Sequence, residues 1–259
     1  MNFDQFKDKA AKILNIKLDG YKIKRVKRRT DSLMRRRDVD DYRECLALIK
    51  NDLNFRRAYI NHFTINTSEF YRNPKNYQHL QDKILPELLA KNNKLKIWSA
   101  PCSNGSEPYT VAIILTEMGI SSSRYEILAS DLDPDIISDA RRGLYKENAV
   151  KDVPDSILKK YFTINDNSDK KYKLDRNIKN KVKFEKRDLI YGKYIADWDL
   201  IISRNFFIYL TKKLKGEIIK RFVSVLKKDG YLFLGNTEFI FRSDHYALQK
   251  DKYSFYKKS

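Results

Sequence analysis

The chain has 259 residues, of which 42% are hydrophobic, so it can bury a sizeable core in one large domain or in two smaller ones. Its formal net charge of +19 predicts an acidic partner, such as nucleic acid, an anionic membrane or an acidic protein. No apolar run approaches the roughly 20 residues that span a bilayer, and the N-terminus has no signal-peptide core, so we expect a soluble, cytoplasmic protein. The two cysteines are expected to be reduced, and the three scattered histidines have no metal-binding spacing, so no metal site is predicted.

Residues 1–62 are predicted to form a basic helical domain. The segment 3–14 places apolar residues at helical spacing, and Asp19-Gly20 ends this helix. The segment 21–37 carries nine basic residues and one acid, so the charge is concentrated there rather than spread as a general surface excess of lysine. Because helices this short are unstable alone, we expect them to pack on each other or on the next domain.

Residues 63–74 are predicted to be a linker, and residues 75–259 an α/β domain. From residue 95 onward, apolar runs typical of strands alternate with amphipathic runs typical of helices, which predicts a mainly parallel sheet covered by helices. The expected strands are 95–100, 125–131, 182–188, 198–203, 231–235 and 251–258, and the expected helices include 134–143 and 211–230. Residues from about 144 to 181 interrupt the alternation, and we favour an insertion that contains a hairpin over an extended surface loop.

The segment 95–133 has the pattern of a nucleoside-binding half-domain. A strand is followed by a loop of small residues at 101–106, a helix, and a second strand that ends in Asp131. Such a loop brings backbone N–H groups close to a ligand, and Asp131 can accept hydrogen bonds from both ribose hydroxyls. Only Gly105 is present where a dinucleotide fingerprint needs three glycines, and the loop lacks the lysine of a P-loop. A nucleoside cofactor without a pyrophosphate, such as S-adenosylmethionine, therefore fits best.

Several acids in this pattern have a second explanation. Glu107 could pair with the ammonium of the cofactor, or could simply be a favourable acid at a helix N-terminus. Asp131 could be a turn residue, although its place at the end of the second strand favours the ribose. Asp188 and Leu189 follow the third strand, where an adenine-binding side chain would lie, but Asp188 taken alone fits a solvated turn better.

The segment 199–210 ends the fourth strand with Ser203-Arg204-Asn205-Phe206. Methyltransferases that act on base nitrogens often carry an Asn/Asp-Pro-Pro-aromatic turn here, so its absence argues against base N-methylation, and no nucleic-acid partner is expected. Arg204 and Asn205 are expected at the carboxyl end of the sheet, where such folds bind ligands.

Five ordered motifs together resemble the CheR-type chemotaxis-receptor protein-glutamate methyltransferases. The matching residues are Asn66, Ser68, Phe70, Tyr71 and Arg72; Trp98, Ser99, Ala100, Cys102, Ser103, Gly105, Glu107, Pro108 and Tyr109; Ser130 to Asp133; Arg204, Asn205, Ile208 and Tyr209; and Gly235, Thr237 and Glu238. The chain departs from the family pattern at Asn104, Ser106, Ser203 and Phe206.

The resemblance implies a class I, Rossmann-like S-adenosylmethionine-dependent methyltransferase domain, with an all-α N-terminal domain and a small inserted β subdomain. It implies cofactor contacts from Asn66, Ser68, Arg72, Ala100, Glu107, Asp131, Leu132, Asp188, Leu189, Asn205 and Phe206. We assign Arg72 to orienting the cofactor and the substrate carboxylate, and Tyr209 to shaping the methyl-transfer pocket.

The implied substrate is a glutamate in the acidic, helical methylation region of membrane chemoreceptors. Arg28, Arg29, Arg35 and Arg36 are expected to dock on that region. In some relatives a Gly-rich hairpin in the insertion binds a receptor tail peptide, but the segment 163–175 has no glycine, which favours the tail-independent branch. We expect recruitment to receptor arrays without membrane insertion. An RNA methyltransferase and a cofactor-sensing adaptor remain the alternatives.

Overall fold

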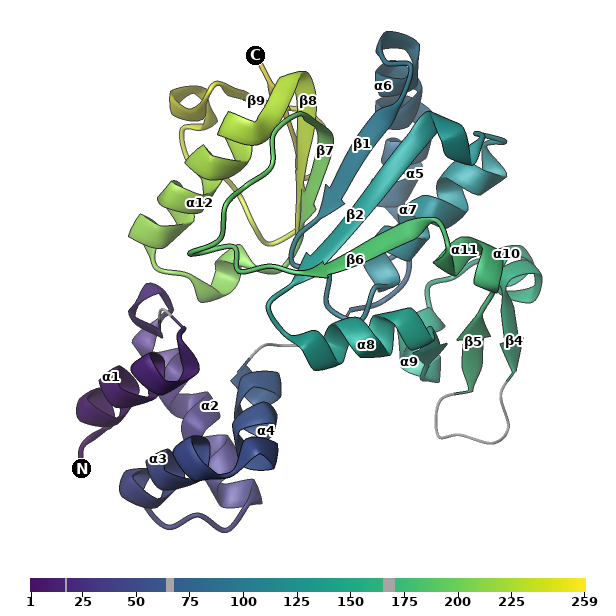
Figure 1. The fold of residues 1–259 in the computed structure, drawn as a ribbon. Coiled ribbons are helices and arrows are strands. Elements are labelled where there is room, and N and C mark those ends of the chain that lie inside the picture. Colours follow the sequence, from purple (N-terminus) through teal and green to yellow (C-terminus); the bar gives the residue numbers. More distant parts are fainter. Residues whose placement is uncertain (17, 64–67, 165–170) are drawn as a thin grey trace. The chain divides into compact units, whose positions relative to one another are not determined.

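The computed structural model describes residues 1–16, 18–63, 68–164 and 171–259 (Figure 1). The chain divides into two compact units. The first comprises residues 1–66 with Tyr209–Glu217, and the second comprises residues 67–208 with 218–259. Within the described residues, no helix is both long and apolar enough to cross a bilayer.

The first unit is all-α, as the sequence predicts. Its helices are α1 (Phe3–Leu14), α2 (Ile23–Arg36), α3 (Tyr42–Asn51) and α4 (Leu53–Phe63), with a 3-10 turn at Leu18–Gly20. Local signals set the helix starts: the Asn2 side chain accepts from the Gln5 amide, and the Asp41 side chain accepts from the amides of Arg43 and Glu44. The apolar stripes meet in a core that includes Phe6, Val26, Cys45, Ile49 and Tyr59.

The second unit is built on a seven-stranded sheet in the order β6-β2-β1-β7-β8-β10-β9. The strands are β1 (Leu95–Ser99), β2 (Tyr125–Asp131), β6 (Val182–Lys186), β7 (Trp198–Ser203), β8 (Leu226–Leu234), β9 (Leu248–Lys250) and β10 (Phe255–Lys258). All neighbours are parallel except β10, which runs antiparallel to both β8 and β9. β7 is buried along its whole length, the expected state of a central parallel strand covered on both faces.

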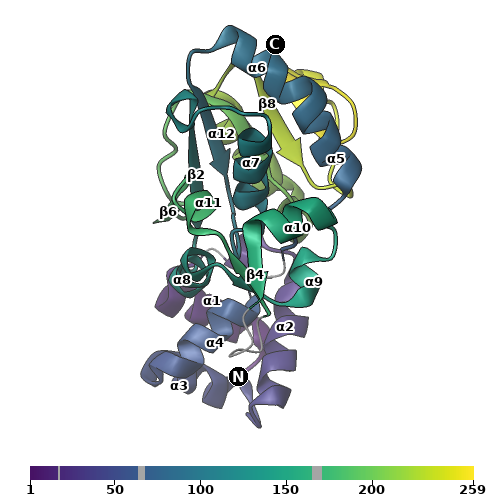
Figure 2. The ribbon, with the colours of Figure 1, turned by 90° about the vertical axis from the view of Figure 1, so that its right-hand side faces the viewer.

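Helices cover both faces of the sheet (Figures 1 and 2). They are α5 (Pro74–His79), a π-helical turn (Leu80–Ile84), α6 (Leu85–Lys91), α7 (Ser106–Glu117), α8 (Pro134–Arg142) and α12 (Lys212–Val225). α5, α6 and α7 share one core cluster with Ile97, Leu200 and Phe233 of the sheet. On the other face, the Trp98 and Phe222 rings meet with centroids 5.5 Å apart.

The sequence misplaces the boundary between α12 and β8. A helix was expected over 211–230, but α12 ends at Val225 and β8 already begins at Leu226. The register between β7 and β8 shifts between Trp198 and Leu200, and Asp229 adopts a φ of 62°. This irregularity lies at the polar residues 227–229, which resemble the end of a helix in sequence because they precede Gly230. The short β9 was not predicted.

The insertion contains a hairpin, as favoured from the sequence. Its elements are β3 (Leu144–Tyr145), α9 (Glu147–Val150), α10 (Asp155–Tyr161), β4 (Phe162–Ile164), β5 (Tyr172–Leu174) and α11 (Arg176–Lys179). The strands form an antiparallel sheet in the order β3-β5-β4. Phe70 anchors this sheet to the rest of the unit, because its ring meets those of Tyr145 and Phe162 at 4.8 and 5.1 Å.

Candidate functional site

The candidate site lies where the parallel strands end. The loop after β1 is joined to both neighbouring strands: the Ala100 amide donates to the Ile202 carbonyl, and the Cys102 amide donates to the Ser130 carbonyl, each at 2.8 Å. Because carboxyl ends of parallel strands meet at one edge of a sheet, this loop lies beside Asp131 of β2 and the residues that follow β7.

The loop turns sharply at Gly105, whose φ is +82°. A Cβ there would lie 3.0 Å from the Tyr109 ring and 3.2 Å from the Phe184 ring, so no larger residue fits without a shift. The two departures from the family pattern in this loop contact each other. The Asn104 Oδ1 accepts the Ser106 hydroxyl at 2.7 Å, and the Asn104 Nδ2 donates to the Ser68 carbonyl at 3.0 Å. Together they hold the loop against the junction.

Two buried carboxylates face this region. Glu107 begins α7 with 6% of its surface exposed, and its Oε1 accepts the Ser99 hydroxyl at 2.7 Å. Burial raises the pKa of Glu107 to about 7, and the nearby Arg204 charge opposes that rise. Asp131 is 5% exposed and accepts the Ser103 and Asp133 amides, yet burial still raises its pKa to about 6. Buried acids with raised pKa values in one region are typical of a ligand site.

Arg204 joins the end of β7 to the junction. Its guanidinium donates to the Tyr77 hydroxyl at 3.1 Å, to the Arg72 carbonyl at 2.8 Å and to the Asn73 Oδ1 at 2.7 Å. Tyr71 and Asn73 have positive φ values of 52° and 63°, so this segment is held in a conformation that the arginine stabilises. The sequence predicted Arg204 at the ligand-binding edge of the sheet, but it did not predict these contacts with the junction.

Glu238 fixes the loop after β7 in the same way. Its Oε2 accepts the amides of Asn205 and Gly235, both at 2.7 Å, and its Oε1 accepts the Ile208 amide at 3.3 Å. Asn205 is thereby held at a φ of 60°. Glu238 was recognised as part of a motif, but its role as a backbone acceptor was not predicted.

The other predicted cofactor residues fall into distinct environments. Asn66 lies outside the described residues. Asp188 accepts the amides of Ile190 and Tyr191 at 2.6 and 3.1 Å, which is the turn arrangement weighed as its alternative role, while Leu189 is buried. Phe206 and Leu132 are partly buried, and Ala100 is fully buried.

The remaining predicted residues belong to the first unit. The Arg25 guanidinium lies 4.8 Å from the centroid of the Tyr209 ring. Arg28, Arg35 and Arg36 are exposed on α2, whereas Arg29 is partly buried and donates to the His62 carbonyl.

The site suits S-adenosylmethionine. The hydroxyls of Ser103 and Ser203 and the Arg204 Nε are buried without a hydrogen-bond partner among the described residues. These unpartnered groups, together with two carboxylates whose pKa values are raised, Glu107 and Asp131, suit a ligand that carries an ammonium, ribose hydroxyls and an adenine. In the parts of the chain that the structure describes, no group of three or more His, Cys, Asp or Glu side chains could hold a metal ion.

Comparison with known proteins covers nearly the whole chain. The family model described as the all-alpha domain of CheR methyltransferase matches residues 1–64, and the model described as its SAM binding domain matches residues 66–255. A chemotaxis protein methyltransferase of Listeria innocua is 31% identical over 247 residues, which cover 95% of this chain and 93% of that protein. A Salmonella typhimurium protein of the same name is 30% identical over 83% of this chain and 78% of its own length.

The geometry and the comparisons agree. The sheet order, the nucleoside-type loop and the two buried carboxylates describe a methyltransferase site, and two adjoining family models match both units. The chain therefore belongs to the CheR family of S-adenosylmethionine-dependent chemotaxis protein methyltransferases, which methylate chemoreceptor glutamates.

Proposed function

We propose that this protein methylates glutamate γ-carboxylates in the acidic, helical methylation region of chemoreceptors, and that it needs no receptor tail peptide to do so. The observation that carries the proposal is the pair of buried carboxylates, Glu107 and Asp131, beside the loop after β1. We further propose that it acts in the cytoplasm, at membrane receptor arrays, because its substrate segments are there.

The chemistry needs alignment rather than a general base. A glutamate side chain has an ordinary pKa of about 4.3, so the nucleophile is already ionised at neutral pH. When bound, S-adenosylmethionine would supply a methyl group on a cationic sulfur, and transfer of that methyl group to the carboxylate oxygen, with cleavage of the carbon–sulfur bond, would give a methyl ester and S-adenosylhomocysteine. Positioning of this kind can lower a barrier by roughly 7–11 kcal/mol.

Different side chains of the site are proposed to bind different parts of the cofactor. We propose that Glu107 pairs with the ammonium of the cofactor, that Asp131 accepts its ribose hydroxyls, and that Leu132, Asp188 and Leu189 contact its adenine. Ser68, Ala100, Asn205 and Phe206, with Asn66, would complete the pocket. Arg72 orients the cofactor and, through it, the carboxylate, because a direct strong ion pair would stabilise the ground state. Tyr209 is proposed to shape the methyl-transfer pocket.

The basic helix α2 is proposed to dock on the acidic receptor. Its one acid, Asp31, is already neutralised: the Lys27 ammonium lies 2.7 Å from Asp31, and the Tyr42 hydroxyl donates to Asp31 at 2.6 Å. Arg28, Arg35 and Arg36 are exposed, and Arg29 adds charge while it holds the His62 carbonyl. Tail independence is supported by the absence of glycine from the segment 163–175 of the insertion.

Transfer of radiolabelled methyl groups to receptor-containing membranes tests this function directly. We expect label on a receptor band, and we expect mild base to release it because the product is a carboxylic ester. Removing the receptor's C-terminal residues should leave the rate unchanged. Base-stable label, or label on co-purifying RNA, would contradict the assignment, and cofactor binding without any transfer would favour an adaptor.

Charge reversal on α2 should slow receptor methylation. For Arg35→Glu combined with Arg36→Glu, we expect the rate at low salt to fall by about tenfold or more, because electrostatic steering raises association rates by roughly that factor or above. The difference should shrink at high ionic strength. The matched control is Lys50→Glu with Arg57→Glu, two exposed residues of α3 and α4. Equal rates for both double variants at low salt would refute docking through α2.

A further inference from the structure

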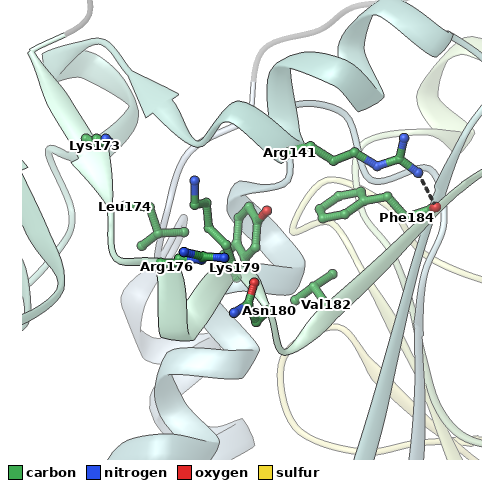
Figure 3. A pocket seen from close by; sticks show the side chains of 9 residues that line it. Arg141, Lys173, Leu174, Arg176, Lys179, Asn180, Val182 and Phe184 are labelled. Atoms are coloured by element: carbon green, nitrogen blue, oxygen red, sulfur yellow. Dashed lines mark hydrogen bonds between the residues drawn. The ribbon is translucent and has the colours of Figure 1, made fainter.

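A basic pocket lies between the insertion and the sheet, within the second unit. It has a volume of about 400 Å³. Four of its nine lining residues are cations, Arg141, Lys173, Arg176 and Lys179, and none is an acid. In Figure 3, Arg176 and Lys179 project from the same short helix, α11, whereas Arg141 points toward the Phe184 carbonyl and Lys173 lies apart on β5. The pocket therefore concentrates positive charge in a concave space.

These four cations form no ion pair with any carboxylate in the described parts of the chain. The acids nearest to them in sequence are engaged elsewhere. Asp175 caps α11 through the Asn177 amide, Asp139 pairs with Arg142, and Glu185 pairs with Arg187. The pocket thus gathers positive charges that no carboxylate of the described residues neutralises, which favours an anionic occupant.

Two of the cations are already held in place by backbone carbonyls. The Lys179 Nζ donates to the Arg142 carbonyl at 3.2 Å, and one Arg141 nitrogen donates to the Phe184 carbonyl at 2.6 Å. A lysine has three N–H donors and an arginine five, so each keeps donors for a ligand. Preorganised donors reduce the entropy lost on binding.

Aromatic rings form the floor of the pocket. Tyr109 and Phe184 both line it, with ring centroids 5.5 Å apart. The same two rings are the close neighbours of Gly105 in the cofactor loop. The floor of the pocket and the support of the cofactor loop are therefore the same pair of side chains.

We propose that this pocket binds a nucleotide, with its phosphates on Arg176 and Lys179 of α11 and its base against Phe184. Guanidinium groups match phosphate oxygens two at a time, and a volume of about 400 Å³ suits a small molecule rather than an extended acidic peptide. Aromatic rings offer a base a stacking surface. Because the same two rings neighbour Gly105, we expect any coupling between this pocket and the cofactor site to be reciprocal.

Calorimetric titration of ADP into protein saturated with S-adenosylhomocysteine tests this site, since the adenosine site is then filled. We expect ADP to bind, and Arg176→Glu with Lys179→Glu to weaken it by about tenfold or more. The variant that combines Arg176→Gln with Lys179→Gln should also bind ADP more weakly than the unaltered protein. The control, Lys159→Glu on α10, reverses an exposed charge of the same insertion outside the pocket and should bind as the unaltered protein does.

Three results would overturn the proposal. They are no ADP binding to the saturated protein, ADP binding that the double variants leave unchanged, and equally tight binding of pyrophosphate or hexaglutamate. The last would mean that any compact or extended anion is accepted and that the base plays no part. Thermal unfolding of each variant shows whether a loss of binding reflects a loss of folding.

Discussion

Replacing Glu107 with glutamine is expected to weaken S-adenosylmethionine binding about 100-fold, because removing one member of a buried charge pair costs about 2–5 kcal/mol. The same substitution should stabilise the ligand-free protein. Burial raises the pKa of Glu107 from 4.5 to about 7, a difference that corresponds to on the order of 3 kcal/mol. Glutamine removes this penalty and can still accept the Ser99 hydroxyl.

The sign of the pH dependence follows from the raised pKa. Between about pH 4.5 and pH 7 the folded state binds more protons than the unfolded state, so stability falls as pH rises through that window. The gain from Glu107→Gln should therefore be complete above pH 7 and absent below pH 4.5. For the unaltered protein, cofactor affinity should fall about tenfold from pH 8 to pH 6, since the ionised acid is the binding form.

Denaturant unfolding across pH, together with cofactor titration, measures both effects. Glu117→Gln is the matched control, because Glu117 lies on the same helix and its contacts, with the Lys160 ammonium and the Tyr161 hydroxyl, lie near the surface. In that control the free energy of unfolding should fall by less than about 1 kcal/mol, and the affinity for the cofactor should be unchanged. A Glu107→Gln protein that binds cofactor normally, with an unchanged pH profile, would remove Glu107 from the proposed site.

Local patterns predicted the parts of the fold that depend on short stretches of chain. Strands β2 and β7 have the predicted bounds, because each is a mainly apolar run that ends in a polar residue, with one acid, Glu126 or Asp199, inside it. Asp133 and Gly143 begin and end α8 as expected, since an Asx cap and a left-handed glycine act within a few residues. The all-α first unit and the inserted sheet followed from the same kind of signal together with the resemblance.

Features that join distant segments could not be predicted in this way. Arg204 contacts residues more than 120 positions earlier in the chain, and Glu238 holds amides some 30 positions earlier. No local sequence pattern predicts either set of contacts. The hydrogen bond between the Ser106 hydroxyl and Asn104 Oδ1 could not be predicted either. In the sequence, each of these residues is only a departure from the family pattern.

Replacing Arg204 is expected to lower the stability of the protein and to shift the pH dependence of cofactor binding. Arg204→Met keeps most of the apolar packing against Tyr77 and Phe233 but removes three hydrogen bonds. Because the partners are left buried, we expect the free energy of unfolding to fall by about 2–4 kcal/mol. The loss of a positive charge near Glu107 should also raise the pKa of that acid further, so the pH midpoint of cofactor affinity should move upward.

The pH midpoint of cofactor affinity distinguishes a positioning role of Arg204 from a role in packing alone. Arg204→Lys keeps the charge but not the forked geometry, so it should lose stability while its midpoint stays near that of the unaltered protein. Arg221→Met is the matched control, since the Arg221 guanidinium also holds backbone carbonyls, those of Leu189 and Ile190, and lies over the Tyr194 ring. It should destabilise the protein without moving the midpoint, because Arg221 is not among the charges that act on Glu107. If Arg204→Met lost stability and left the midpoint in place, Arg204 would serve the fold alone, and its charge would not act on the pKa of Glu107.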